Sequence, residues 1–277
     1  MLHRVQTNTD GASAIDFFAR HAVFTREEFV GALDPQHKRS PRTLETMLSY
    51  HTRQGHLLRV RRGLYASVPR PMTAQTLPVD PLLIVGKLAT DCVISYHSAL
   101  EHHGKAYSTH REHVAFSARA VNPFDFRGLR FRTVPFTRTA GRGTPIRYGF
   151  LPQERQGVVV EVTTLERTLV DVLDRPDLAG GWEEVWRSLE LVEFFEIAQA
   201  VDYALRLGNR TTNAKLGFFL ETHREPLMVD DKHLERLRRL RPKQPHPMDR
   251  KLGGKLVPGW NLIVPRSILE RSWEEPS

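Results

Sequence analysis

The chain has little of what secreted, membrane-spanning and disulfide-bonded proteins contain. Cys92 is its only cysteine, which excludes an intramolecular disulfide and a cysteine-based zinc site. No apolar run approaches the length of a membrane span, and the opening MLHRVQTNTDGAS has no apolar core of the signal-peptide kind. The 277 residues, 40% of them hydrophobic, suffice for one large or two ordinary packed domains. The sequence therefore predicts a cytoplasmic protein that does not contact a membrane.

Catalytic motifs are missing as well. The sequence has no HExxH, phosphate loop, GxSxG or dinucleotide fingerprint. Thirteen histidines are present, and five lie between His97 and His113, but their spacing fits no standard zinc pattern. His97 and Glu101 share one helix face, which favours a salt bridge or cap over a metal site. Glu161 ends an apolar strand, yet a nuclease would place Lys where Thr163 stands. We therefore predict no enzyme, no catalytic residue, no metal and no cofactor.

Nearly all of the net positive charge lies in one short segment. The whole chain carries +8 at pH 7, with an isoelectric point near 9.9. Residues 36–70 alone contain eight Lys and Arg against a single acid, Glu45, which is a net +7. Such a concentrated basic surface usually faces a polyanion.

The order of residues in this segment predicts a winged helix-turn-helix. Ser40 can cap a helix whose first position is Pro41, and apolar residues then recur on one side of that helix. The runs LLRV and LYAS around Gly63 predict a basic hairpin, the wing. A solvated basic face is the alternative, but it would scatter charge around the helix. The residues expected to contact DNA are Arg39, Ser40, Arg42, Thr43, Thr46, Ser49, Arg53, Arg59, Arg61 and Arg62.

Flanking signals set the expected domain limits. A helix over residues 13–21 and a capping box from Thr25 to Glu28 supply two helices before the basic helix. Three helices and a wing make a DNA-binding domain of residues 1–70. The proline-spaced stretch 71–79 reads as a linker.

Residues 80–277 are expected to form a larger mixed α/β domain, which makes the chain α+β overall. Helices are predicted from Asp80 and Ser95, and a second capping box from Thr163 to Glu166 should start the helix LERTLVDVLDR. That helix should bury Leu165 among other apolar residues. The strands expected are HVAFSA, LRFRTV, IRYGF, VVVEV and, near the end, NLIVP. Later helices are expected at 182–191, 194–207, 212–222 and 231–240.

Charge also alternates along this second domain. Residues 160–203 carry eleven acids and three arginines, a net −8, which should face away from DNA or toward another protein. Residues 232–251 carry eight basic residues and two acids, a net +6. A second phosphate contact and a solvated helix face both remain open for this late basic run.

Several stretches resemble the AbiEi-type antitoxins. The segments VFTREEF (23–29) and RQGHLLRVRRGLYASVP (53–69) resemble the winged-helix head of that family. SYHSALEHHG (95–104) is similar to a helix near the start of its antitoxin domain. The most distinctive stretch is VVVEVTTLERTLVDVLDRPDLAGG (158–181), in which a strand leads into a helix with the Glu-Arg-Thr…Asp motif. The resemblance covers about residues 17–264.

The resemblance implies a two-part protein. The head would bind inverted repeats in the promoter of its own operon and repress it. The C-terminal domain would counteract a co-encoded toxin that resembles nucleotidyltransferases, without needing a stable complex with it. By match to the family motif, the signature residues of that domain are Glu166, Arg167, Thr168 and Asp171. A structural role is favoured for them, with Glu166 in the capping box and Arg167 paired to Asp171.

Two other functions are open from the sequence. One is a stand-alone winged-helix transcription factor whose C-terminal domain senses a ligand or dimerises. The other is a metal-dependent nuclease that uses the histidine-rich region. The function predicted here is a DNA-binding antitoxin and autorepressor without catalysis.

Overall fold

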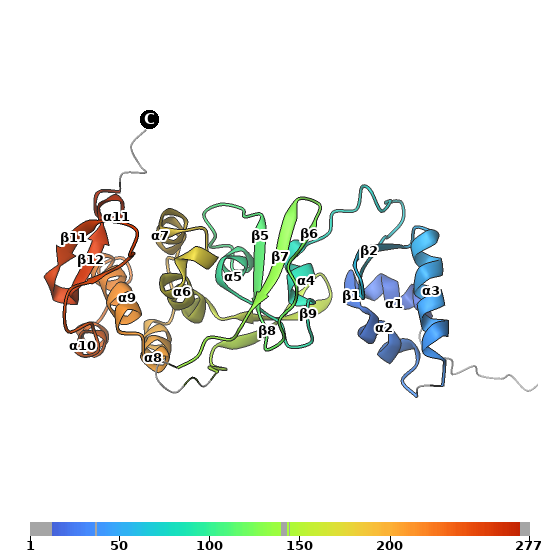
Figure 1. Ribbon diagram of the computed structural model, residues 1–277, viewed down its shortest axis with the longest axis horizontal. Helices are drawn as coiled ribbons and strands as arrows, with labels where there is room; N and C mark the ends of the chain where they lie inside the picture. Colours follow the sequence, from blue (N-terminus) through green and yellow to red (C-terminus); the bar gives the residue numbers. More distant parts are fainter. Residues whose placement is uncertain (1–12, 37, 140–142, 144, 272–277) are drawn as a thin grey trace, which may run out of the picture. The chain divides into compact units, whose positions relative to one another are not determined.

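The structure, a computed structural model, describes residues 13–36, 38–139, 143 and 145–271 (Figure 1). The opening residues, which were expected to lack a signal-peptide core, thus lie almost wholly outside the described part. The chain divides into two compact units: the first comprises residues 1–90 and 153–160, and the second comprises 91–152 and 161–277. No described helix is both long and apolar enough to cross a membrane. The first unit extends beyond the predicted linker at 71–79, and independent folding of residues 1–70 stays a prediction.

The first unit is a winged helix-turn-helix with one added helix. Its elements are α1 (Ala14–Arg20), β1 (Val23–Thr25), α2 (Arg26–Leu33), α3 (Pro41–Arg53), β2 (Leu57–Arg61), β3 (Leu64–Ser67) and α4 (Pro81–Gly86). The three strands form an antiparallel sheet in the order β1-β3-β2. The capping box is present, because Thr25 accepts from the amide of Glu28 and Glu28 accepts from that of Thr25. The predicted helices and hairpin of this unit are therefore confirmed.

One apolar core positions the basic helix. Phe17 and Phe24 lie edge to face with ring centroids 5.0 Å apart, the kind of aromatic pair that packs best. Leu44 and Leu48 of α3 join these rings, together with Leu57 of β2. Helix α3 therefore lies against β2, as Figure 1 shows, and the helix and the wing are fixed to the same core.

The second unit is built around a mixed six-stranded sheet. Its sheet strands are β4 (Val93–Ile94), β5 (Glu112–Phe116), β6 (Phe124–Phe126), β7 (Leu129–Val134), β8 (Phe150–Arg155) and β9 (Val158–Thr163). They run in the order β6-β7-β5-β4-β9-β8, with β5–β7 and β4–β9 parallel and β4–β5 and β6–β7 antiparallel. The tip of the β8–β9 hairpin, residues 153–160, is grouped with the first unit.

Helices and a small second sheet complete this unit. The helices are α5 (Tyr96–His102), α6 (Leu165–Asp174), α7 (Trp182–Glu190), α8 (Ile197–Leu207), α9 (Arg210–Thr222), α10 (Asp231–Arg239) and α11 (Arg266–Glu270), with short 3-10 turns at Pro176–Leu178 and Pro258–Trp260. The small sheet has the order β10-β12-β11, from His246–Pro247, Leu262–Pro265 and Gly254–Val257. Helix α9 lies beside β12 (Figure 1). The α+β fold class predicted from the sequence is confirmed.

The strand predicted at IRYGF is wrong for all but its last residue. Strand β8 begins only at Phe150. The preceding carbonyls of Ile146 and Tyr148 accept hydrogen bonds from the Arg167 guanidinium, and the carbonyl of Gly149 accepts one from Thr164. Gly149 also has φ +70°, which is outside the range of strands. A buried side chain from another element thus takes the hydrogen-bonding groups that a strand would need.

The second capping box is also wrong. The cap of α6 is Thr164, one residue later than expected, and its hydroxyl accepts from the amide of Arg167. The third helical position is therefore Arg167, and Glu166 instead accepts from the backbone amide of Glu196, at 3.2 Å. Thr163 is drawn into the core, where its hydroxyl lies 2.7 Å from that of Thr168. Leu165, expected to be buried, is only partly so.

Two other predicted helix starts also differ from the structure. Helix α8 begins at Ile197 rather than Phe194, which is 70% exposed, and α9 begins at Arg210 rather than Thr212. The helix start after Ser95 is as predicted, but the Ser95 hydroxyl makes no capping bond and is buried without a hydrogen-bond partner.

Gly217 in α9 provides a test of the close packing in the second unit. A Cβ added there would lie 2.2 Å from ring carbons of Trp260, which is fully buried. We expect Gly217→Ala to lower the free energy of unfolding by about 1–3 kcal/mol or more, because overpacking forces the ring to move. Urea unfolding followed by tryptophan fluorescence would measure this loss. Gly259→Ala is the matched control, since nothing lies within 4 Å of its added Cβ. Equal stability of the two variants would contradict the packing argument.

Candidate nucleic-acid interface

Helix α3 is held at its start by side-chain capping. Ser40 accepts from the amide of Thr43 at 3.2 Å, and Pro41 occupies the first helical position. Just before it, the carboxylate of Asp34 accepts from the amides of Lys38 and Arg39, both at 2.8 Å. The Ser40 side chain thus caps an amide in the first turn of α3, where donors lack partners within the helix. The Asp34 side chain fixes the backbone of the two basic residues that precede the helix.

The helix has one buried face and one exposed polar face. Leu44 and Leu48 are buried, and Met47 packs against them at the edge of the core. The exposed residues of α3 and its start include all seven predicted there: Arg39, Ser40, Arg42, Thr43, Thr46, Ser49 and Arg53. Within the described residues, Arg42 and Arg53 have no carboxylate within 4.0 Å. Their charges are therefore available to an external anion.

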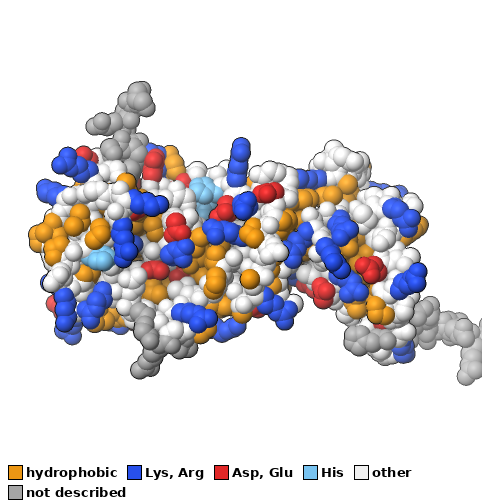
Figure 2. Space-filling view, in the orientation of Figure 1, with side chains coloured by type: hydrophobic (Ala, Val, Ile, Leu, Met, Phe, Trp, Pro, Cys, Tyr) orange, Lys and Arg blue, Asp and Glu red, His pale blue; other side chains and the backbone are white. Residues whose placement is uncertain are grey.

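The wing adds further cations to the same unit. Its turn requires Gly63, which has φ +80°. Arg59 and Arg62 are exposed, while Arg61 is half-buried beside an irregularity in the β2–β3 register. Figure 2 shows Lys and Arg side chains gathered over the visible face of this unit, with few acids among them. The contact of these residues with DNA stays a prediction, but Arg59 and Arg62 are exposed to solvent, as such a contact requires.

Three of the four predicted signature residues of the second unit, Arg167, Thr168 and Asp171, are buried. Arg167 is 0% exposed, and its Nε lies 3.0 Å from Oδ2 of Asp171, which is 1% exposed. The hydroxyl of Tyr203 donates to Asp171 Oδ1 at 2.6 Å. The guanidinium also lies over the rings of Phe116, Phe150 and Tyr203, at 5.1, 4.5 and 4.7 Å. The predicted ion pair is confirmed, and its burial makes it a structural centre.

Burial governs the electrostatics of this network. It raises the pKa of Asp171, while the Arg167 charge and the Tyr203 hydroxyl oppose the shift. It also raises the pKa of Tyr203 well above its ordinary value, and the nearby Asp171 carboxylate adds to the effect. Tyr203 therefore remains a hydrogen-bond donor at any physiological pH.

Three of the eight basic residues in the late basic run pair with carboxylates of their own unit. Arg236 contacts Asp202 at 2.7 Å, and Lys232 contacts Asp230 at 2.7 Å. Arg238 pairs with Glu221 and also lies over the Trp260 ring. These contacts favour the solvated helix face over a phosphate contact. The acidic stretch is likewise not all surface, since Asp171 and Glu184 are buried.

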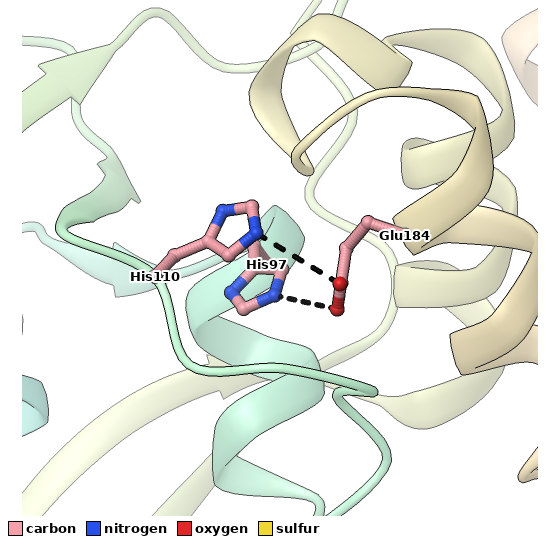
Figure 3. Close-up of side chains that lie close together, drawn as sticks. All are labelled: His97, His110 and Glu184. Atoms are coloured by element: carbon pink, nitrogen blue, oxygen red, sulfur yellow. Dashed lines mark hydrogen bonds and ion pairs between the residues drawn. The ribbon is translucent and has the colours of Figure 1, made fainter. Parts of the chain in front are cut away.

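The histidine-rich region contains the predicted His97–Glu101 pair and more. His97 Nδ1 lies 3.3 Å from Glu101 Oε1, while its Nε2 lies 3.0 Å from Glu184 Oε1 (Figure 3). Sequence reasoning missed Glu184, because it lies 87 residues away on α7 and no local spacing indicates it. His110 stacks on His97 with ring centroids 3.7 Å apart. Burial and the neighbouring His97 lower the pKa of His110, whereas bonds from Ser108 and His97 outweigh burial and lower that of Glu184.

Comparison with known proteins identifies the first unit. Residues 13–68 match the family model described as a transcriptional regulator, AbiEi antitoxin. The N-terminal part of the chain is thus similar to a domain of this regulator and antitoxin family. The model ends at residue 68, so the antitoxin resemblance of the second unit stays a prediction.

The whole chain is similar in fold to the RV2827C protein from Mycobacterium tuberculosis, known from a crystal structure. The superposition has a TM-score of 0.60 at 16% sequence identity and covers 96% of this chain and 98% of that one. At this identity the similarity shows the fold alone. No curated protein matches the chain by sequence.

The buried pair in the second unit leads to a test of its structural role. We expect Arg167→Met to lower the free energy of unfolding by about 3–5 kcal/mol, because Asp171 is left as an uncompensated buried charge. Arg167→Met combined with Asp171→Leu should lose less than the single variant, because no unpaired charge remains. Chemical denaturation would measure both.

The exposed pair between Arg175 and Asp177 serves as the matched control. Its side chains are 52% and 60% exposed, so Arg175→Met should change stability by less than about 1 kcal/mol. A similar loss at both arginines would mean that burial does not determine the role of Arg167.

Proposed function

We propose that this protein is a DNA-binding antitoxin that represses its own operon and counteracts a co-encoded toxin resembling nucleotidyltransferases. The observation that carries the DNA-binding part is the exposed, unpaired basic face of α3 beside a basic wing, in a domain matched to a regulator family. The antitoxin part rests on the resemblance of the second unit and is the less direct of the two.

Helix α3 has the dimensions and the chemistry of a recognition helix. Its 13 residues extend about 20 Å, and a B-DNA major groove about 12 Å wide admits such a helix. Arg42 near its start can donate two N–H groups to the O6 and N7 of a guanine, while the Thr46 and Ser49 hydroxyls can reach bases or phosphates. Glu45 on the same exposed side can accept from a cytosine amine, or it lowers non-specific affinity.

The wing supplies the sequence-independent part of binding. Arg59 and Arg62 are exposed next to the turn at Gly63, where a hairpin can follow the phosphate backbone or enter the minor groove. Inverted repeats in the promoter would be read by two copies of the chain, because a two-fold site calls for a two-fold protein arrangement.

The second unit would act on the toxin without using its signature side chains as contacts. Arg167 and Asp171 are buried, so they cannot touch a partner and serve to shape the domain. A stable complex with the toxin is not required by the proposal. Neutralisation would then be an effect seen on co-expression rather than a tight interface.

One feature favours the alternative, a transcription factor whose second unit senses a ligand. A cleft of about 740 Å³ in this unit is lined by Tyr96, Phe136, Arg138, Arg175, Asn209 and Arg210, among others. Aromatic rings and arginines together suit a planar anionic ligand. A toxin gene directly downstream, with loss of toxicity on co-expression, would decide for the antitoxin.

The wing should act through phosphates. We expect Arg61→Ala with Arg62→Ala to weaken binding to the upstream promoter duplex and to a scrambled duplex alike. The salt dependence should flatten by about 0.9 in slope for each lost phosphate contact. Fluorescence titrations at several salt concentrations would measure this, with Arg20→Ala on α1 as the control that keeps the wild-type slope. An unchanged slope in the wing variant would remove the wing from the interface.

The helix should act differently in the same titrations. Arg42→Ala should lose roughly 1–3 kcal/mol on the promoter duplex and little on the scrambled one. Equal weakening on both duplexes would make Arg42 a phosphate contact only. Equal affinity of the wild-type protein for both duplexes would refute promoter recognition altogether.

Repression and neutralisation should be separable in the full chain. We expect a variant with Arg42, Arg61 and Arg62 all changed to Ala to lose repression of a promoter–reporter fusion. It should still protect cells that express the downstream gene product, because the second unit is untouched. Cell growth and reporter activity are the two readouts. Loss of both activities together would mean that neutralisation works only through repression.

A further inference from the structure

Three side chains from separate elements of the second unit point toward one small volume. His97 lies on α5, His110 on the loop before β5, and Glu184 on α7, as Figure 3 shows. Each offers one ligand atom, and the three atoms all lie within 4.8 Å of one another. His97 and Glu184 are buried, and the His110 side chain is 25% exposed. The sequence draws attention to the histidine-rich region with His97 and His110, but nothing in it indicates Glu184, which lies 87 residues beyond His97.

The spacing matches the dimensions of a tetrahedral metal site. Zn–N and Zn–O bonds of about 2.0–2.2 Å place neighbouring ligand atoms about 3.3–3.6 Å apart. The distances found are 3.0 Å from His97 Nε2 to Glu184 Oε1 and 3.9 Å from His110 Nε2 to Glu184 Oε2. The two values bracket the required range, and the stacked His110 ring must rotate so that its Nε2 turns toward an ion held by His97 and Glu184.

Hydrogen bonds account for the positions of the His97 and Glu184 side chains, but not for that of the His110 ring. The contact of His97 Nε2 with Glu184 is a normal hydrogen bond, but that of His110 Nε2 is too long for one. The two imidazoles are nonetheless stacked nearly parallel, at 13°, with both Nε2 atoms facing the same carboxylate. Two histidines that share one carboxylate are a usual donor set for a divalent transition metal.

The ligands are oriented by a second layer of contacts. Glu101 Oε1 lies 3.3 Å from Nδ1 of His97 and also accepts from the backbone amide of His110 at 3.1 Å. Ser108 donates to Glu184 through both its amide, at 3.0 Å, and its hydroxyl, at 2.6 Å. A carboxylate behind the far nitrogen of a histidine is the usual way in which metal sites fix the ring and raise its basicity.

The backbone next to α7 is shaped to admit the His110 ring. Gly180 has φ +83°, and a Cβ added there would lie 2.0 Å from His110 Cε1 and 2.9 Å from Glu184 Cγ. Only glycine leaves room for the ring beside the carboxylate. The position of His110 is thus built into the fold rather than left to a free loop.

We propose that His97 Nε2, His110 Nε2 and the Glu184 carboxylate bind one divalent transition-metal ion of the zinc class. The partly exposed side of His110 leaves a fourth position for water. The ion ties α5, the loop before β5 and α7 together, so its main consequence is added stability of the second unit.

The test uses the full-length protein, stripped with a chelator and dialysed. Calorimetric titration with zinc chloride should show one ion per chain, and zinc should raise the melting temperature. Cobalt(II) should give the visible absorption bands of a tetrahedral site. His110→Gln should weaken zinc binding more than about 100-fold, since losing an outer-layer partner alone costs about 10–100-fold. Glu101→Gln tests that outer layer and should fall within the smaller range.

Two further variants distinguish zinc binding at this site from zinc binding at other histidines and from a loss of binding caused by misfolding. His246→Gln removes a histidine on β10 and should bind zinc as the wild type does. Glu184→Gln keeps the shape and one acceptor for Ser108, so it provides a second ligand variant if His110→Gln folds poorly. Absence of stoichiometric zinc and cobalt binding by the wild type would overturn the proposal. Zinc binding that survives both ligand variants would overturn it equally.

Discussion

The full charge of Arg167 inside the second unit is the constraint around which that unit is arranged. An unpaired guanidinium there would cost several kcal/mol, a large part of a typical protein's net stability, and several neighbouring elements contribute partners. Helix α6 supplies Asp171, the segment before β8 supplies the carbonyls of Ile146 and Tyr148, and aromatic rings from β5, β8 and α8 cover its faces. These contacts join α6, α8 and the segment before β8 to the sheet through one buried side chain.

In the first unit, by contrast with Arg167, the arginine side chains lie mainly at the surface. Arg42 and Arg53 of α3 are kept out of the core and away from described carboxylates, while an all-apolar cluster around Phe17 and Phe24 holds α3 and the wing. Like charges gathered on one surface repel each other, and an external polyanion relieves that repulsion. In the second unit, by contrast, Arg236 and Arg238 of α10 are paired with Asp202 and Glu221. Arginine thus has a different role in each unit: in the first unit it offers charge for binding, and in the second unit it contributes to internal packing.

Much of the fold could be predicted because it depends on short-range chemistry. The capping box at Thr25, the Ser40–Pro41 start of α3 and the hairpin turn at Gly63 are each decided by a few adjacent residues. The predicted DNA-binding side chains of α3 are exposed for the same reason, since helical periodicity alone separates them from Leu44 and Leu48. The prediction failed at IRYGF, where the buried Arg167 side chain of α6 donates to the backbone carbonyl of Ile146. It also failed at Thr163, whose hydroxyl bonds to that of Thr168 instead of capping the helix.

By itself the sequence determined the winged helix, its basic face, the α+β class and the existence of an Arg167–Asp171 pair. Each of these is set within one helical turn or one hairpin, where the chain's own geometry brings the residues together. Only the tertiary structure decided that this pair is buried, that IRYGF is not a strand, and that Glu184 meets His97 and His110. Those outcomes join residues up to 87 positions apart, and the packing of helices on the sheet, not any local pattern, brings such residues into contact.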